Sequence, residues 1–324
     1  MPTIRLHNIP NSTRVLVSCL IIIASLIFLI KLGHFRSATT DIKFHDIQVP
    51  YLQLIPRYTI FYPWVIVTSI FAETTIFSLI VSGTVLTVAS KYIERFWGFR
   101  EVIQFVFING SITNLSTVLI TIVSNIVRKD GVGMDRPLGG GISYYFGFLV
   151  VLKQLIPEHN IVLFQGLLNF RVKHLPFICL IIVFLWSIII SRSLYPVIPS
   201  FESFLVSYNY LRFYQSFTSD PLLPINNNET IIRGDASDAF KLVEFFPNIT
   251  KPYLSIVFDK FYEGSVFLGI VTPFNDDSIE QGNIRASKRS EQINQTQKSL
   301  ANSVAERRRQ VALQVIEDRI RDSR

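Results

Sequence analysis

A serine and four glycines lie close together in the stretch GGGISYYFG, residues 139–147, where an apolar run begins. The residue type with nucleophilic chemistry is Ser143. A serine hydroxyl is a weak nucleophile unless a hydrogen-bonded base takes its proton. Histidine is the usual base, and no histidine follows His174 in the chain. Whether Ser143 can react therefore depends on where the surrounding elements place it and His174.

Composition assigns most of these elements to a membrane. Hydrophobic residues make up 49% of the 324 residues and charged residues 17%, too apolar a balance for a soluble domain of this size. Of the 31 Lys and Arg residues, 15 lie from Arg212 onward. The basic charge thus belongs largely to a polar C-terminal third, which fits an interfacial or cytosolic tail better than a nucleic-acid-binding surface.

The cysteine and histidine positions do not indicate a metal site or a disulfide bond. Cys19 and Cys179 both lie inside apolar runs and are most simply buried apolar side chains. The histidines before His174 are scattered without metal-ligand spacing: His7, His34, His45 and His159. We expect no metal and no cofactor.

Six apolar segments are expected to span the membrane as helices, since a span needs about 20 apolar residues. The apolar stretch 59–90 is too long for one span and is interrupted by Glu73, so we divide it into an interfacial segment and a span. No small-residue cleavage site follows the first segment, which indicates a retained signal anchor. The fold class predicted is an all-α membrane protein, a six-helix bundle with a cytosolic C-terminal tail. The expected spans are residues 14–32, 74–90, 102–126, 140–156, 175–190 and 199–213.

Six spans place both termini on one side of the membrane. The short loops carry equal numbers of Lys and Arg on the two sides and do not discriminate, whereas the basic tail favours cytosolic termini. Ser143 then lies near the luminal face and His174 at the cytosolic end of the fifth span. They are separated by about a bilayer's thickness, ~30 Å, whereas proton transfer needs roughly 3 Å.

The tail divides into two segments after the membrane domain of residues 1–216. Residues 217–274 are semi-apolar, and residues 275–324 form a polar linker and a basic amphipathic helix. In that helix Leu300, Val304, Val311 and Val315 recur on one stripe. The helix can be solvated and bind a partner, or attach to the membrane surface.

Several motifs resemble the rhomboid superfamily, and a more specific set resembles the transmembrane protein 115 family. The superfamily motif is a Pro-Trp entry, a Thr-Ser-x-Phe run and a Glu-x-x-x-Gly-x-Arg exit. The stretches LVSYNYLRFYQ, RGDASDAFKLVEFFP and KYIERFWG, with Pro252 and the glycines of the fourth span, resemble the second family. The resemblance covers most of residues 60–260. The superfamily motif falls on Pro63, Trp64, Thr68, Ser69, Phe71, Glu94, Gly98 and Arg100.

The resemblance implies that the glycine turn of rhomboid proteases is present in this chain and that their catalytic residues are not. The Gly-x-Ser-Gly motif of rhomboid proteases falls on residues 140–143, so Ile142 takes the nucleophile's place. The oxyanion-stabilising His and Asn fall on Ser78 and Ser82, and the sixth span contains no histidine. We therefore expect a protein that is not an enzyme, with an active protease as a distant alternative.

The remaining candidates are structural or interaction residues. Glycines such as Gly140 and Gly147 allow helices to approach closely in lipid, with ligand binding as the alternative. Glu73 is a functional candidate as an intramembrane carboxylate, and Glu94 is expected to pair with a neighbouring arginine at its helix end. In RGDASD the acidic residues are expected to form a helix N-cap rather than an integrin-type motif, because the segment is cytosolic. The candidates are Glu94, Gly98, Gly140, Gly147, Arg212, Arg233, Gly234, Asp235, Asp238 and Pro247.

The family resemblance also implies a location and a role. It implies a multi-pass Golgi membrane protein, cycling with the endoplasmic reticulum, that supports Golgi-to-endoplasmic-reticulum retrograde transport. Its tail would recruit coat proteins or a Golgi tethering complex such as the conserved oligomeric Golgi complex. The alternative is a pseudoprotease that binds or moves membrane-protein or lipid clients, as derlin-like relatives do. Membrane lipids and a second copy of the chain are further partners, and no nucleic acid is expected.

This topology predicts that the protein is not N-glycosylated, although it has six Asn-x-Ser/Thr sequons. None of the six lies in an expected luminal loop: four are cytosolic and two lie within the third span. Endoglycosidase treatment should leave the electrophoretic mobility unchanged. A mobility shift that disappears on mutating Asn228 or Asn248 would show that the orientation is wrong. The sequons are at Asn11, Asn109, Asn114, Asn228, Asn248 and Asn294.

Overall fold

The computed structural model describes residues 9–37, 43–129, 131–163, 168–217 and 232–292, with single positions 295, 306, 309 and 310. The described residues form two compact units. Unit 1 comprises those up to Lys153 and those from His174 to Gly234. Unit 2 comprises those of 154–173 and those from Asp235 onward. The stripe expected in the closing helix, Leu300 to Val315, lies outside the described residues.

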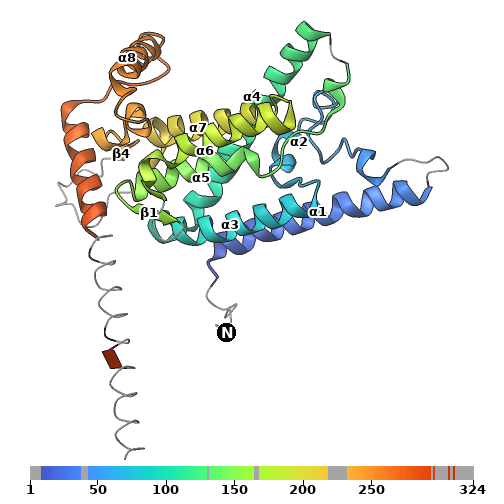
Figure 1. Ribbon diagram of the computed structural model, residues 1–324, viewed down its shortest axis with the longest axis horizontal. Coiled ribbons are helices and arrows are strands. Elements are labelled where there is room, and N and C mark those ends of the chain that lie inside the picture. The colour runs from blue at the N-terminus through green and yellow to red at the C-terminus, as the bar shows by residue number, and fades with distance from the viewer. Residues whose placement is uncertain are drawn as a thin grey trace, which may run out of the picture. The chain divides into compact units, whose positions relative to one another are not determined.

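Unit 1 is helical, with a helix at each of the six expected span positions (Figure 1). Among the described residues, α1, α3, α4 and the segment 172–191 are long and apolar enough to cross a membrane, and α5 is a shorter apolar helix. The all-α membrane fold is confirmed. The helices are α1 (Asn11–Ser37), α3 (Ile76–Trp97), α4 (Phe99–Arg128), α5 (Ile142–Leu155), α6 (Leu175–Trp186) with a π-helical turn Ser187–Ser191, and α7 (Val197–Asn209) with a π-helical turn Tyr210–Tyr214.

The apolar stretch 59–90 breaks where the sequence predicted. Two short turns, α2 (Val65–Thr68) and η3 (Ser69–Phe71), end at Ala72, and α3 starts at Ile76. Thr75 and Ser78 form a reciprocal capping box at the start of α3, in which the Ser78 N–H donates to Thr75 Oγ1 over 3.1 Å. Such caps satisfy amide groups that a helix leaves unpaired. Glu73 is thus left in a non-helical connection between two helices.

The bundle has small polar side chains inside and large apolar side chains outside. On α4 the buried side chains include Asn109, Thr113 and Thr117, which are four residues apart and therefore share one face. Ser203 and Ser207 are fully buried on α7, which packs against α4. Many isoleucine, leucine and phenylalanine side chains are exposed instead. This arrangement suits lipid, where close approach and interhelical hydrogen bonds hold helices together.

One polar junction joins α4, α5 and α7. The Asn109 side-chain amide donates to the Ser143 carbonyl over 3.2 Å and to Ser203 Oγ over 3.3 Å. The Gly147 N–H donates to the same Ser203 Oγ over 3.2 Å. A Cβ atom at Gly147 would lie 2.4 Å from the Asn109 amide nitrogen, so only glycine permits this approach.

Unit 2 combines a hairpin from between α5 and α6 with the tail. The strands β1 (Asn160–Leu163) and β2 (Leu168–Arg171) pair antiparallel. From Asp235 the chain forms two 3₁₀ turns, η9 (Asp238–Phe240) and η10 (Leu242–Phe245), and then α8 (Lys251–Phe267). Residues 276–292 are helical, so the segment expected to begin as a linker is largely a helix.

Asp235 connects three segments of unit 2 by hydrogen bonds. Its carboxylate accepts hydrogen bonds from the Gln154 amide and the Arg289 guanidinium, each 2.9 Å long. The Ser237 N–H and hydroxyl donate to the other carboxylate oxygen over 3.1 and 2.6 Å. Burial by itself would raise the pKa of Asp235, but the Arg289 charge and these hydrogen bonds lower it to about 2.

The predicted helix N-cap in this motif is wrong. Ser237 precedes η9 without a capping hydrogen bond from its side chain, and only 3₁₀ turns follow. Asp235 folds back onto Ser237 two residues later, a local turn that competes with helix formation. Asp238 instead accepts from the Asn283 amide over 2.8 Å and pairs with Lys241.

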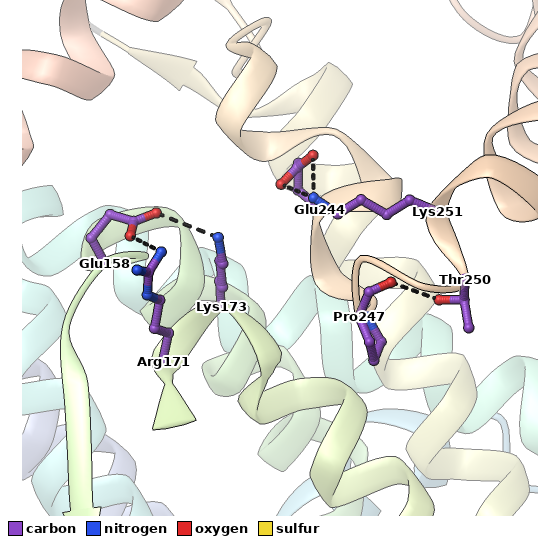
Figure 2. A network of polar contacts seen from close by, with 7 residues as sticks. All are labelled: Glu158, Arg171, Lys173, Glu244, Pro247, Thr250 and Lys251. Carbon is purple, nitrogen blue, oxygen red and sulfur yellow. Dashed lines mark hydrogen bonds and ion pairs between the residues drawn. The ribbon is translucent and has the colours of Figure 1, made fainter. Parts of the chain in front are cut away.

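Four further polar residue pairs stabilise unit 2 (Figure 2). Glu158 pairs with Arg171 at 3.0 Å and with Lys173 at 3.7 Å, bracketing the hairpin. Lys251 donates to both carboxylate oxygens of Glu244 at 2.8 Å. The Pro247 carbonyl accepts from the Thr250 hydroxyl over 2.9 Å, just before α8 begins.

Replacing Asp235 with Asn should destabilise unit 2 by about 3 kcal/mol, because it leaves the Arg289 charge without its partner in a largely buried position. Hydrogen exchange of residues 235–292 in the detergent-solubilised full chain measures this. The folded-state pKa lies below the ordinary 3.8, so the stabilisation is present above about pH 4 and lost as the pH falls towards 2.

The matched control is Asp259→Asn, which changes an exposed carboxylate on α8. Its effect should stay within about 0.5 kcal/mol. Equal exchange rates in the Asp235→Asn and Asp259→Asn proteins would contradict the role given to Asp235.

Candidate functional site

The glycine turn ahead of α5 is fixed by backbone hydrogen bonds. The Gly140 N–H donates to the Ser69 carbonyl over 2.7 Å, which ties the turn to η3. The Gly139 N–H donates to Tyr195 Oη over 2.6 Å, and the Tyr195 hydroxyl donates back to the Gly139 carbonyl over 2.8 Å. Gly140 has a φ of +86°, a conformation that favours glycine.

The carboxyl group of Glu73 lies against this turn. The Gly141 N–H donates to Glu73 Oε1 over 2.7 Å. The Ser82 hydroxyl, on α3, donates to the same oxygen in a short hydrogen bond. A Cβ atom at Gly140 would lie 3.1 Å from the other carboxylate oxygen. The carboxylate thus occupies the space beside the turn and satisfies the Gly141 amide.

A tyrosine on α5 extends this hydrogen-bonded chain. Tyr145 Oη lies 2.5 Å from Ser82 Oγ. Because the single Ser82 proton goes to Glu73, Tyr145 is the donor in that contact. A Cβ atom at Gly141 would lie 2.5 Å from both hydroxyl oxygens. Gly141 is therefore needed so that α3 and α5 can approach closely enough for the chain Tyr145 to Ser82 to Glu73.

Ser143 is buried in the bundle and hydrogen-bonded to the backbone of the turn. It is fully buried, and its hydroxyl donates to the Gly140 carbonyl over 3.0 Å. That bond commits the only hydroxyl proton to the backbone of the turn. Ile142 begins α5 at the place of the nucleophile. Ser78, at the place of one oxyanion donor, instead caps α3.

The donors of the turn therefore hold an anion, and Ser143, the serine of the turn, has no hydrogen bond to a base in the described part of the chain. Backbone amides and hydroxyls that point at one position stabilise negative charge, and here the negative charge is the protein's own Glu73. Among the described residues, no group of three or more His, Cys, Asp and Glu side chains could hold a metal ion.

The predicted pairing of Glu94 with an arginine is wrong. Glu94 accepts from the Ser12 N–H over 3.1 Å and from the Ser12 hydroxyl in a short hydrogen bond. Ser12 lies in the first turn of α1, where unpaired amides and the helix dipole favour a carboxylate. Glu94 thus joins the end of α3 to the start of α1.

The other candidate residues lie apart from the glycine turn. Their contacts are backbone hydrogen bonds, strand pairing and close packing. Gly98 separates α3 from α4 with a φ of +82°, and its N–H donates to the Glu94 carbonyl. Arg233 pairs with Ser216 in the short hairpin of β3 (Ser216–Phe217) and β4 (Ile232–Arg233). Arg212 is buried, and a Cβ atom at Gly234 would lie 2.1 Å from its carbonyl oxygen.

Sequence reasoning missed Tyr145 and Tyr195 altogether. Tyr195 precedes α7 and contacts the turn across 56 residues, which no local pattern indicates. Glu73 did carry a signal, since a carboxylate inside an apolar stretch is rare in membrane segments.

Comparison with known proteins agrees with this architecture. The family described as "Eukaryotic integral membrane protein (DUF1751)" matches residues 14–322. The chain therefore belongs to this family of integral membrane proteins. No solved structure matches the chain significantly.

Individual relatives make the resemblance more specific. The chain is 30% identical over 331 residues to "Transmembrane protein 115 homolog" of Saccharomyces cerevisiae, covering 98% of this chain and 94% of that protein. It is 25% identical over 267 residues to human "Transmembrane protein 115", covering 81% and 68%. It is 30% identical over 214 residues to "Rhomboid-like protein 19" of Arabidopsis thaliana, covering 66% of each chain. The predicted resemblance to the transmembrane protein 115 family is confirmed.

Replacing Glu73 with Ala should lower the free energy of unfolding by roughly 2 kcal/mol, because it leaves the Gly141 amide and the Ser82 hydroxyl unpaired. Thermal unfolding of the purified protein in detergent measures this loss. Glu73→Gln is the matched variant: its amide oxygen can still accept both hydrogen bonds, so it should lose less. If Glu73→Ala proved as stable as the wild type, the carboxylate would not hold the turn.

Proposed function

We propose that this protein is a non-enzymatic, rhomboid-like Golgi membrane protein that supports Golgi-to-endoplasmic-reticulum retrograde vesicle transport. The observation that carries the non-enzymatic part is Glu73, whose carboxylate fills the place beside the glycine turn. A substrate carbonyl at that place would have to displace a carboxylate held by the Gly141 amide and the Ser82 hydroxyl. Ser143 is not available there as a nucleophile, since it donates to the Gly140 carbonyl.

The transport part rests on the resemblance to the transmembrane protein 115 family and on the tail. In this proposal both termini are cytosolic, and the tail recruits a tethering complex, such as the conserved oligomeric Golgi complex, or coat proteins. The helix α8 supports this, because none of its residues is buried among those described. Tyr253, Val257 and Phe261 recur every four residues on one face, and Tyr253 and Phe261 are 76% and 72% exposed. Exposed aromatic side chains of this kind are frequent anchors of protein interfaces.

The double variant Tyr253→Ser, Phe261→Ser tests the tail's role. Both side chains are exposed, so the variant should remain folded and in the membrane. Proximity labelling from the C-terminus in cells lacking the endogenous protein should recover tethering or coat subunits at least about tenfold less, as expected for the loss of interface anchors. Golgi retrieval should fail in parallel.

Asp259→Ser with Glu263→Ser is the control for that variant. By helical spacing Asp259 lies on the side of α8 away from Tyr253 and Phe261, and Glu263 lies one turn further along beside Asp259. The control should capture partners and restore retrieval as the wild type does. Equal loss in both variants would assign the effect to tail stability rather than to the apolar face.

The alternative function is that the bundle binds and moves membrane-protein or lipid clients. A cavity between α1 and α3 inside unit 1 favours this alternative. A chain truncated after Gln215 that still restores retrieval in null cells would show that the bundle acts alone. That result would overturn tail recruitment in favour of client handling.

A further inference from the structure

We propose that the cavity between α1 and α3 binds a membrane glycerophospholipid, with the lipid phosphate at the Lys31 ammonium group. The cavity has a volume of about 420 Å³, within the range of small-molecule sites. This inference is independent of the trafficking role, because it concerns a binding site in the bundle rather than the tail.

The lining of the cavity is amphipathic. Its apolar lining includes Ile27, which is buried, and Ile21, Phe28 and Ile76, which are more than half exposed. Its polar lining residues are Ser25, Lys31, Glu73, Thr74 and Thr75. The apolar lining suits an acyl chain, and the polar lining residues suit a headgroup.

Lys31 is a largely buried residue that lines the cavity and has no protein counter-charge in the described part of the chain. Its residue is 6% exposed, and it makes no hydrogen bond or ion pair with any described residue. Removing an ammonium group from water without a partner is costly. An anion that enters the cavity would offset that cost.

The depth of Lys31 along α1 points to a phosphate. Residues 15–30 contain no charged side chain, so Lys31 is the first charge after the apolar run. At 1.5 Å per residue that run is about 24 Å long, close to the ~30 Å hydrocarbon core of a bilayer. Lys31 therefore lies near the level where phospholipid phosphates begin.

Glu73 lines the same cavity, and its negative charge disfavours a phosphate beside it. Its carboxylate is already hydrogen-bonded to the Gly141 amide and Ser82, and its charge repels an anion. No ion pair joins it to Lys31. The phosphate is therefore expected at the Lys31 ammonium group, and a cationic headgroup amine would be tolerated beside the Glu73 carboxylate.

Photo-cross-linking in reconstituted vesicles tests the site. The full-length protein is placed in phosphatidylcholine vesicles that contain a minor fraction of phosphatidic acid with a diazirine on one acyl chain. Mass spectrometry should map the cross-links to residues 21–31 and 74–79. Lys31→Met should reduce this labelling about tenfold or more, as expected for the loss of a charge-assisted hydrogen bond, and Lys31→Arg should retain it.

Two controls separate phosphate recognition from unspecific contact with lipid. Lys91→Met removes an exposed lysine on α3 and should label as the wild type does. A diazirine diacylglycerol, which lacks the phosphate, should label the cavity weakly in every variant. Labelling by a diazirine phosphatidylethanolamine as strong as that by phosphatidic acid would show that the phosphate, rather than net lipid charge, is recognised.

Equal labelling of the wild type and Lys31→Met, or equal labelling by the phosphate-free analogue, would overturn the proposal and leave only an apolar groove. Cross-links confined to other helices would overturn it as well. Purification of the wild-type protein with a membrane-protein helix cross-linked at residues 21–31, in place of lipid, would assign the cavity to a protein client.

Discussion

The hydrogen bonds that hold the Glu73 carboxylate organise the region around the glycine turn. The Gly141 amide at the start of α5 and the Ser82 hydroxyl on α3 donate to one oxygen, and Ser69 accepts from the turn itself. In lipid no water replaces such bonds, so an unpaired group at this place lowers the stability of the bundle. Ser82, on which an oxyanion donor of rhomboid proteases falls by the resemblance, donates to this carboxylate. The hydrogen bonds to Glu73 thus explain how the glycine turn keeps its conformation while Ser143 has no histidine partner in the described part of the chain.

The interior of the bundle follows the same physical constraint. Polar groups that face inward, such as Asn109, Ser203 and Glu94, are paired across helices, and large apolar side chains face lipid. Lys31 carries a full charge and forms no ion pair with any described residue, which is why we infer an external anion there. Glu73 and Lys31 thus line the same cavity. The Glu73 carboxylate accepts hydrogen bonds from the protein, whereas we propose that the Lys31 ammonium group binds the phosphate of a lipid.

The sequence predicted the features that depend on local composition. Hydropathy located a helix at each of the six expected positions, and the interruption at Glu73 correctly divided the stretch 59–90. It failed where a side chain meets a partner far along the chain. Glu94 contacts Ser12 across 82 residues, and Asp235 contacts Gln154 across 81. The expectations of an arginine partner and of an N-cap used neighbours in sequence, whereas long-range packing decides both. Packing of the β1–β2 hairpin with the tail is non-local as well.

We infer that this protein keeps the glycine turn of rhomboid proteases without their catalytic chemistry. Labelling of the purified, reconstituted wild-type protein with a fluorophosphonate serine probe tests it most directly, because such probes report an activated serine independently of any substrate. We predict that the wild type and Ser143→Ala are equally unlabelled and that both restore Golgi retrieval in null cells. Labelling of the wild type that disappears in Ser143→Ala would contradict the account.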